Sequence, residues 1–206
     1  MSQPKVPQHP AFYRGSTMPK QVLIPIADGS EDIEAVTIID TLRRAGAQVT
    51  VASCNPDGGM TITASQKTKI TADIHIDTCT EEQFHLIALP GGMPGAENLK
   101  SCKPLVTLLH RQHRAGKWYA AICASPAVVL AHHGLLDNVQ ATCYPSFMAQ
   151  MEGALLHPKN AIVVDGKKRV ITGQGPGNAL SFSFKLIDAL YGKDAFRPIA
   201  EQMIAD

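Results

Sequence analysis

Cys123 is the residue whose surroundings most clearly favour chemistry. An apolar segment typical of a strand, residues 118–122, ends on this cysteine, and an apolar helix begins at once with Pro126 in its first turn. The pattern matches the G-x-S-x-G strand–turn–helix motif, with cysteine in the serine position and Ala121 and Ser125 replacing the glycines. Such a turn holds its central side chain above the sheet edge. Free amides at a helix start can lower a cysteine pKa from about 8.5 to roughly 3.5–7.5.

Two interpretations of Cys123 are open from this segment alone, because a free cysteine also packs in a core as a small hydrophobic residue. In a parallel sheet, ligands collect beyond the carboxyl ends of the strands. Three parts of this chain are expected to meet there: the turn at 28–34, the loop containing Gly91 and Gly92, and Cys123. This convergence favours a reactive thiol.

Glu34 is the carboxylate best placed to act on this thiol. It lies about one turn into the first predicted helix, at the edge of the apolar stripe of that helix. In apolar surroundings its pKa would rise, so that it could donate a hydrogen bond to a thiolate or move a proton. The alternative is a solvated acid favoured by the helix dipole, which is our interpretation of Glu31 and Asp32.

The main-chain amides of Gly92 and Ala124 are the expected donors to a developing oxyanion. Glycine permits close approach of the backbone to a ligand. No Gly-Lys-Ser/Thr follows Gly91-Gly92, so this loop is not predicted to bind phosphate. A cysteine hydrolase needs a histidine beside its thiol, but none of the eight histidines has a compelling position. We expect the histidines to be structural.

Alternating strands and helices must position these residues. Buried strands are predicted at 21–27, 48–53, 86–89 and 118–122, and helices at 30–45, 104–115, 178–190 and 194–204. Residues 60–76 suggest short antiparallel strands at a sheet edge, and 90–97 a loop. The remaining predictions are a strand at 141–143, a short helix at 145–151 and a hairpin formed by 161–165 and 169–172. This order predicts an α/β fold in which helices cover both faces of a mainly parallel sheet.

Composition limits the function further. The 206 residues are predicted to form one domain at 20–206, preceded by Pro-rich residues 1–19, either an extended arm or sequence upstream of a start at Met18. A net charge of +1 gives no reason to expect nucleic acid or an anionic membrane as partner. No segment has the roughly 18 apolar residues needed to cross a bilayer.

The five cysteines are scattered without metal-ligand spacing, which suits a reducing cytoplasm and predicts no metal site. The sequence leaves open the roles of the four cysteines outside the elbow motif, which are Cys54, Cys79, Cys102 and Cys143.

Four segments in this order resemble the ThiJ/PfpI superfamily, in the branch of the parkinsonism-associated deglycase and its YajL-like bacterial relatives. They are Asp-Gly-Ser-Glu-Asp-Ile-Glu at 28–34, Leu-Pro-Gly-Gly-Met-Pro-Gly-Ala at 89–96, Ala-Ala-Ile-Cys-Ala-Ser-Pro at 120–126 and Thr-Gly-Gln-Gly-Pro-Gly at 172–177. The resemblance extends from about residue 20 to the C-terminus. It implies a flavodoxin-like three-layer sandwich that forms homodimers through the first helix, with Ile33 in the interface.

The resemblance also implies site residues. Cys123 would be the low-pKa nucleophile, Glu34 its carboxyl partner, and the Gly92 and Ala124 amides the oxyanion donors, with no cofactor and no metal. Gly91 would belong to the pocket.

The chain departs from the family at two positions. Tyr144, before Pro145, stands where the best-described human member has a histidine, so a histidine-dependent triad is doubtful and both residues are expected only to line the pocket. Protease-like members place a histidine directly after the cysteine, where this chain has Ala124.

The resemblance favours a cysteine enzyme acting on α-oxoaldehydes such as methylglyoxal, or on their early adducts, in defence against carbonyl and oxidative stress. The Cys123 thiolate would attack the aldehyde to give a hemithioacetal, Glu34 would move a proton between the adjacent carbons, and water would release lactate. The alternative is a redox-sensing holding chaperone in which Cys123 is oxidised to a sulfinate that protonated Glu34 stabilises. A hydrolase or amidotransferase-like enzyme and a thiamine-biosynthesis (thiazole phosphate) protein are less favoured.

Overall fold

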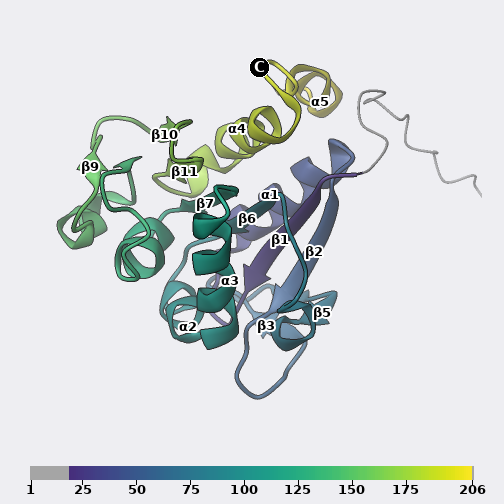
Figure 1. Ribbon diagram of the computed structural model, residues 1–206. Coiled ribbons are helices and arrows are strands. Elements are labelled where there is room, and N and C mark those ends of the chain that lie inside the picture. The colour runs from purple at the N-terminus through teal and green to yellow at the C-terminus, as the bar shows by residue number, and fades with distance from the viewer. Residues whose placement is uncertain (1–18, 206) are drawn as a thin grey trace, which may run out of the picture.

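A seven-stranded sheet forms the centre of the computed structural model, which describes residues 19–205 (Figure 1). The strand order is β10-β11-β7-β6-β1-β2-β5, and the β10–β11 pair is antiparallel while the other pairs are parallel. The strands of this sheet are β1 (Gln21–Ile26), β2 (Gln48–Ser53), β5 (Ile74–His75), β6 (Leu86–Leu89), β7 (Trp118–Ile122), β10 (Ile162–Asp165) and β11 (Val170–Gly173). Two small pairs stand apart, β3 (Thr61–Thr63) with β4 (Lys69–Thr71) and β8 (Gln140–Ala141) with β9 (Leu155–Leu156).

Helices cover both faces of the sheet. The α-helices are α1 (Asp32–Arg44), α2 (Gly95–Ser101), α3 (Lys103–Arg114), α4 (Ala179–Tyr191) and α5 (Arg197–Met203), and the short helices are η1 (Ile76–Cys79), η2 (Pro126–Ala131), η3 (Pro145–Gln150) and η4 (Pro176–Asn178). The core on one face joins α1, α4 and α5 to the sheet, and the core on the other joins α2, α3 and η2. In Figure 1, α2 and α3 lie in front of the sheet and α1 behind it. The molecule is a flavodoxin-like three-layer α/β sandwich, as predicted.

Strand β1 shows why the central strands are apolar throughout. Val22, Ile24 and Ile26 belong to the core beneath α1 and α4, whereas Leu23 belongs to the core beneath α2 and α3. Successive side chains of a strand point to opposite faces. A parallel strand covered on both sides therefore becomes a continuous apolar run.

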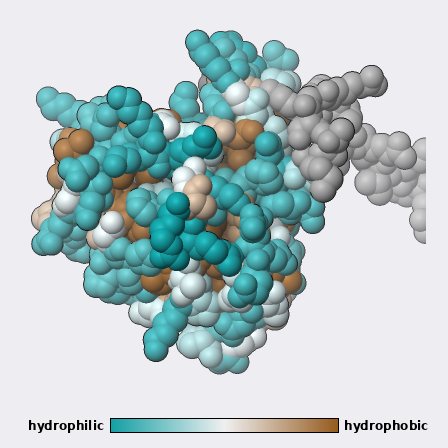
Figure 2. Space-filling view, in the orientation of Figure 1, coloured by the Kyte–Doolittle hydropathy of each residue, from teal (hydrophilic) through white to brown (hydrophobic). Residues whose placement is uncertain are grey.

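Helix α3 has the two-sided character of a surface helix. Its buried residues recur at helical spacing: Leu105, Leu108, Leu109 and Gln112. The opposite side is polar, and the face of the molecule drawn in Figure 2, in the orientation that puts α2 and α3 in front, is mostly hydrophilic. No helix within residues 19–205 is both long and apolar enough to cross a membrane.

Two predictions about elements need correction, and one strand was missed. The segment 90–97 was expected to be a loop, but α2 begins at Gly95 and packs against η2. Residues 60–76 were expected to form antiparallel strands; β3 and β4 do so, but β5 joins the central sheet parallel to β2. Strand β9 was not predicted. The predicted N-terminal arm, residues 1–19, lies outside the described residues except for Pro19. Met18, the alternative start, also lies outside them.

Candidate active site

Cys123 lies in a sharp turn between β7 and η2. Its φ is +64°, a left-handed conformation that costs a non-glycine residue about 1–3 kcal/mol. Two main-chain hydrogen bonds hold this conformation: the Cys123 amide donates to the Gly173 carbonyl at 2.9 Å, and the Tyr144 amide donates to the Cys123 carbonyl at 2.8 Å. The side chain is mostly buried. The strand, the cysteine and the helix that the sequence predicts as a nucleophile turn therefore form a turn of that shape.

The loop that follows β6 packs directly against this turn. A Cβ atom at Gly91 would lie 2.6 Å from the Cys123 Cβ, closer than side chains can approach. Gly92 has a φ of +86°, and a Cβ there would lie 2.5 Å from the Glu31 amide nitrogen. The hydroxyl of Ser125 donates to the Pro90 carbonyl at 2.6 Å and ties the turn to the loop. Both glycines are therefore required by close packing.

Glu34 is completely buried beside Cys123. Its Oε2 accepts a hydrogen bond from the Gly91 amide at 2.7 Å. Among residues 19–205, its other oxygen, Oε1, is buried without a hydrogen-bond partner, and the carboxyl lies beside the Cys123 thiol, so that each group affects the pKa of the other. The side chain of Glu31 caps α1 by accepting from the Glu34 amide at 2.7 Å. The first turn of α1 thus delivers a buried carboxyl to the thiol.

Burial raises the pKa of Glu34 to about 7; the Gly91 amide lowers it and the charge of Glu31 raises it further. Burial also raises the pKa of the Cys123 thiol to about 12, and negative charge on Glu34 adds to that rise. The amides of Gly92 and Ala124 donate to the sulfur and lower the pKa. The sequence names these two amides as oxyanion donors, and in the structure both face the Cys123 sulfur.

The expectation of a low thiol pKa at Cys123 is wrong, because burial raises this pKa and negative charge on Glu34 raises it further. Two neighbouring negative charges in a buried site repel each other, so the Cys123–Glu34 pair favours the state that carries a single negative charge. Once Glu34 is protonated, its charge no longer opposes a thiolate, and its O–H can donate to the sulfur. The protonation state of Glu34 therefore influences the pKa of Cys123, in addition to the effect of burial.

Tyr144 reaches the turn through its main chain. Its ring packs on the loop that follows β11, where a Cβ at Gly175 would lie 3.3 Å from the ring Cδ2. Its side chain is 43% exposed, so it borders the turn at the surface. Pro145 begins η3 directly after it.

Several histidines contact main-chain or side-chain atoms at places away from the turn. His133 Nε2 lies 3.1 Å from the Lys100 carbonyl, His113 Nδ1 lies 3.0 Å from the Tyr119 hydroxyl, and His75 Nε2 lies 3.0 Å from the Asn55 carbonyl. These contacts agree with structural roles.

Asp32 differs from its prediction as a solvated acid. It is 9% exposed and accepts hydrogen bonds from the Gln66 amide at 2.8 Å and the Thr68 amide at 3.2 Å, in the turn between β3 and β4. Burial tends to raise its pKa, but these hydrogen bonds and that of Ser65 outweigh burial and lower it. Sequence reasoning missed this role because the partners lie more than thirty residues away. Sequence reasoning also treated Ser125 only as the replacement of a glycine in the strand–turn–helix motif, whereas its hydroxyl holds the Gly91 loop.

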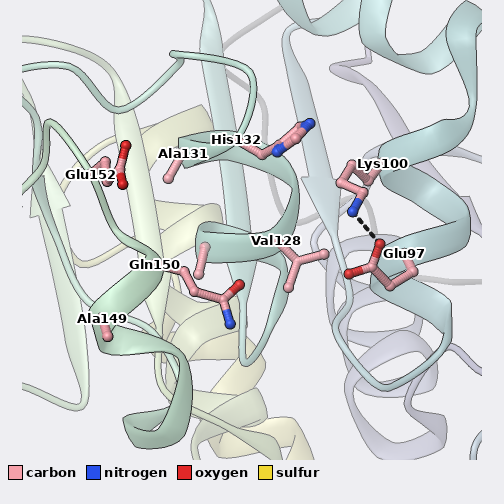
Figure 3. A pocket seen from close by; sticks show the side chains of 9 residues that line it. Glu97, Lys100, Val128, Ala131, His132, Ala149, Gln150 and Glu152 are labelled. Carbon is pink, nitrogen blue, oxygen red and sulfur yellow. Dashed lines mark ion pairs between the residues drawn. The ribbon is translucent and has the colours of Figure 1, made fainter.

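A cavity of about 320 Å³ is lined by residues of η2, α2 and the segment 149–152. Figure 3 shows the ion-paired Glu97 and Lys100 of α2 on one side, Gln150 and Glu152 on the other, and Val128 between them. Neither Cys123 nor Glu34 lines it. Within residues 19–205, no three His, Cys, Asp or Glu side chains gather in a way that could hold a metal ion.

Comparisons with known proteins agree with this architecture. The chain matches the DJ-1/PfpI family over residues 20–189. Protein DJ-1 homolog B of Arabidopsis thaliana is 43% identical over 179 residues, which are 87% of this chain and 40% of the relative. The chain spans less than half the length of this and a second Arabidopsis relative.

Two further relatives are matched over most of their length. The glutathione-independent glyoxalase DJR-1.2 of Caenorhabditis elegans is 32% identical over 174 residues, which are 84% of this chain and 89% of the relative. The solved structure of oxidized Toxoplasma gondii DJ-1 superposes with a TM-score of 0.85 at 43% identity, covering 90% of this chain and 98% of that one. This chain belongs to the DJ-1/PfpI family.

Proposed function

We propose that this protein is a cofactor-independent cysteine enzyme that converts α-oxoaldehydes such as methylglyoxal, or their early adducts with amines and thiols, to hydroxy acids such as lactate. The contact between the Cys123 thiol and the buried Glu34 carboxyl carries this proposal. Two amides donate to the sulfur at the same place, which suits a site where negative charge develops. A family relative named as a glutathione-independent glyoxalase supports the substrate class.

Glu34 is suited to the first proton transfer because its pKa of about 7 lies near neutral pH. As the sulfur of Cys123 attacks the aldehyde carbon, the thiol proton passes to the carboxylate. The new alkoxide accepts hydrogen bonds from the Gly92 and Ala124 amides and then takes that proton, which restores the carboxylate.

The hemithioacetal then isomerises. Glu34 removes the hydrogen from the former aldehyde carbon and returns a proton to the adjacent carbonyl carbon, while the hydroxyl proton of the hemithioacetal passes to the former ketone oxygen, so that a thioester of lactate forms on Cys123. Water cleaves the thioester, releases lactate and regenerates the thiol. The overall reaction adds one water to methylglyoxal and needs no external oxidant or reductant.

The test is lactate formation from methylglyoxal by freshly reduced protein. We expect activity in the wild type and loss of it in both Cys123→Ala and Glu34→Gln. Cys79→Ala is the matched control, because Cys79 is also buried but donates to the Ile76 carbonyl in η1. Wild-type activity no higher than that of the Cys123→Ala variant would refute the proposal for this substrate.

A second candidate is a redox sensor with holding-chaperone activity. The solved structure of a family member is described as oxidized, and a protonated Glu34 would donate a hydrogen bond to a sulfinate at Cys123. This function predicts that peroxide-treated protein suppresses aggregation of a heat-unfolded client, that the reduced protein does not, and that Cys123→Ala removes the difference. Equal suppression by the oxidised and reduced protein would count against it.

We also propose a cytoplasmic homodimer joined through α1. Ile33 and Val36 are 57% and 49% exposed, one turn apart on this helix. Such apolar exposure is expected where a second copy packs. The five cysteines are free, as expected in a reducing compartment.

A further inference from the structure

Cys54 and Cys102 form a second thiol pair, on a different part of the protein from Cys123. Both belong to the core beneath α2 and α3, whereas Cys123 packs with the core beneath α1 and α4. Cys54 follows β2 directly, and Cys102 lies at the junction between α2 and α3. The two side chains are hydrogen-bonded to each other. The fold therefore joins two thiols that are far apart in the sequence.

The surroundings give the two thiols different characters. The Cys54 S–H donates to the Cys102 sulfur, which lowers the pKa of Cys102 to about 7 despite burial. The Leu105 amide, in the first turn of α3, also donates to the Cys102 sulfur. The same hydrogen bond and burial raise the pKa of Cys54. Cys102 is therefore the more acidic thiol of the pair.

This pair lines a cavity that a small molecule can enter. The cavity has a volume of about 320 Å³ and is bordered also by Asn55, His75, Asp77 and Asn98. Cys54 is 5% exposed and Cys102 is 9% exposed. His75 favours negative charge on Cys102, and Asp77 opposes it. Two adjacent thiols that line a cavity open to small oxidants, one of them the more acidic, have the composition of a redox couple.

We propose that Cys102 and Cys54 are a peroxide-sensitive redox couple that closes to an intramolecular disulfide. In the first step, the Cys102 sulfur attacks a hydroperoxide: an S–O bond forms, the O–O bond breaks, and the leaving oxygen takes a proton and departs as water or an alcohol. The product is a sulfenic acid at Cys102. In the second step, the Cys54 sulfur attacks that sulfur, the S–S bond forms, and water leaves. The two thiols lose two electrons, and the hydroperoxide gains them.

The position of both residues in the chain favours this closure. An S–S bond is about 2.05 Å long, so hydrogen-bonded sulfurs must approach each other further. Cys54 lies just beyond the end of β2, and Cys102 lies between two helices. The required adjustment therefore falls outside the regular hydrogen bonding of the strand and helices.

The experiment uses the full chain carrying Cys123→Ser, so that the thiol of the proposed active site cannot contribute. Reduced protein is treated with hydrogen peroxide, the remaining thiols are alkylated, and the protein is digested with trypsin. Trypsin places Cys54 on peptide 45–67 and Cys102 on peptide 101–111, apart from the other cysteines. We expect loss of two thiols per chain, a linked species of these two peptides with a mass lower by two hydrogens, and recovery of both thiols with dithiothreitol.

Two further variants in the same background sharpen the result. Cys54→Ser should abolish the linked peptides and leave a Cys102 sulfenic acid that dimedone traps. Cys143→Ser, which removes a buried thiol outside this cavity, should leave the link unchanged. The proposal is overturned if both thiols stay free at peroxide doses that fully oxidise Cys123 in the wild type, or if Cys102 becomes a sulfinate without a linked peptide. These readouts do not depend on lactate formation, so they are separate from the proposed enzyme activity.

Discussion

Replacing Glu34 with glutamine should remove a pH-dependent contribution to folding stability. Glutamine keeps the shape of the side chain and can still accept the hydrogen bond that the Gly91 amide donates to Oε2. It cannot lose a proton. Any difference in pH dependence between the wild type and this variant therefore reports the ionisation of the Glu34 carboxyl.

The magnitude follows from the environment of the carboxyl. Burial, with a smaller contribution from the charge of Glu31, raises the pKa of Glu34 from 4.5 to about 7 in the folded protein. Between these values the folded chain holds a proton that the unfolded chain has released, so stability falls as the pH rises through this window. At 1.36 kcal/mol per pH unit, the interval corresponds to about 3 kcal/mol lost by pH 7 and above.

The assay is urea unfolding at a fixed chain concentration under reducing conditions, at several pH values from about 4 to 8. The wild type should lose stability over this range relative to Glu34→Gln, by up to about 3 kcal/mol. Glu201→Gln is the matched control, because Glu201 is exposed on α5 and should leave the pH profile unchanged. Parallel profiles for the wild type and Glu34→Gln would refute the raised pKa and, with it, the account of the Cys123–Glu34 pair.

Other substitutions test the packing, the hydrogen bonds and the proposed interface. Gly91→Ala should abolish lactate formation and cost about 1–3 kcal/mol of stability through overpacking. Gly177→Ala should change neither, because a Cβ at Gly177 meets open space. Equal effects of the two substitutions would contradict the packing argument. Asp32→Asn should lower the stability at neutral pH, because hydrogen bonds lower the pKa of this carboxyl although burial opposes them. The stability difference between the wild type and this variant should shrink as the pH falls below 3.8. A difference in urea unfolding that stays constant with pH would count against this explanation. Gln112→Leu should cost about 1–3 kcal/mol in the same assay, because its amide donates to two main-chain carbonyls, and an unchanged midpoint would reject that role. Ile33→Asp should shift the sedimentation coefficient from dimer to monomer, and an unshifted dimer would exclude this residue from the interface.

The elements that the sequence predicted well are those with a strong local pattern. Strands β1, β6 and β7 are continuous apolar runs because both faces of the sheet are covered, and α1 carries its apolar stripe at helical spacing. Helix α2 was missed because Pro94 and Gly95 have the composition of a loop, and its contacts with η2 are not visible locally. The parallel pairing of β5 with β2 likewise depends on tertiary structure.

The candidate site shows the same division. The turn at Cys123, the close approach of Gly91 and the position of Glu34 follow from motifs at the ends of predicted strands and from the phase of one helix. The hydrogen bonds of Asp32 and the contact between Cys54 and Cys102 join segments far apart in the chain. No local pattern carries that information, so sequence reasoning took Asp32 for a solvated acid and left the roles of Cys54 and Cys102 open.

The acidity of a thiol is the property that motifs predict least well, and the two cysteine sites show why. Cys123 and Cys102 both lie at the start of a helix and both accept hydrogen bonds from main-chain amides, yet their pKa values shift in opposite directions. The balance of causes decides the direction: at Cys102 the hydrogen bond from the Cys54 thiol outweighs burial, whereas at Cys123 burial is the largest cause of the rise and negative charge on Glu34 adds to it. The rule that a helix start lowers a thiol pKa therefore holds only when the hydrogen bonds to the sulfur outweigh its burial and any neighbouring negative charge. For Cys123, a proton on Glu34 removes one of the causes that raise the pKa, so reactivity at the turn depends on the carboxyl as well as on the sulfur.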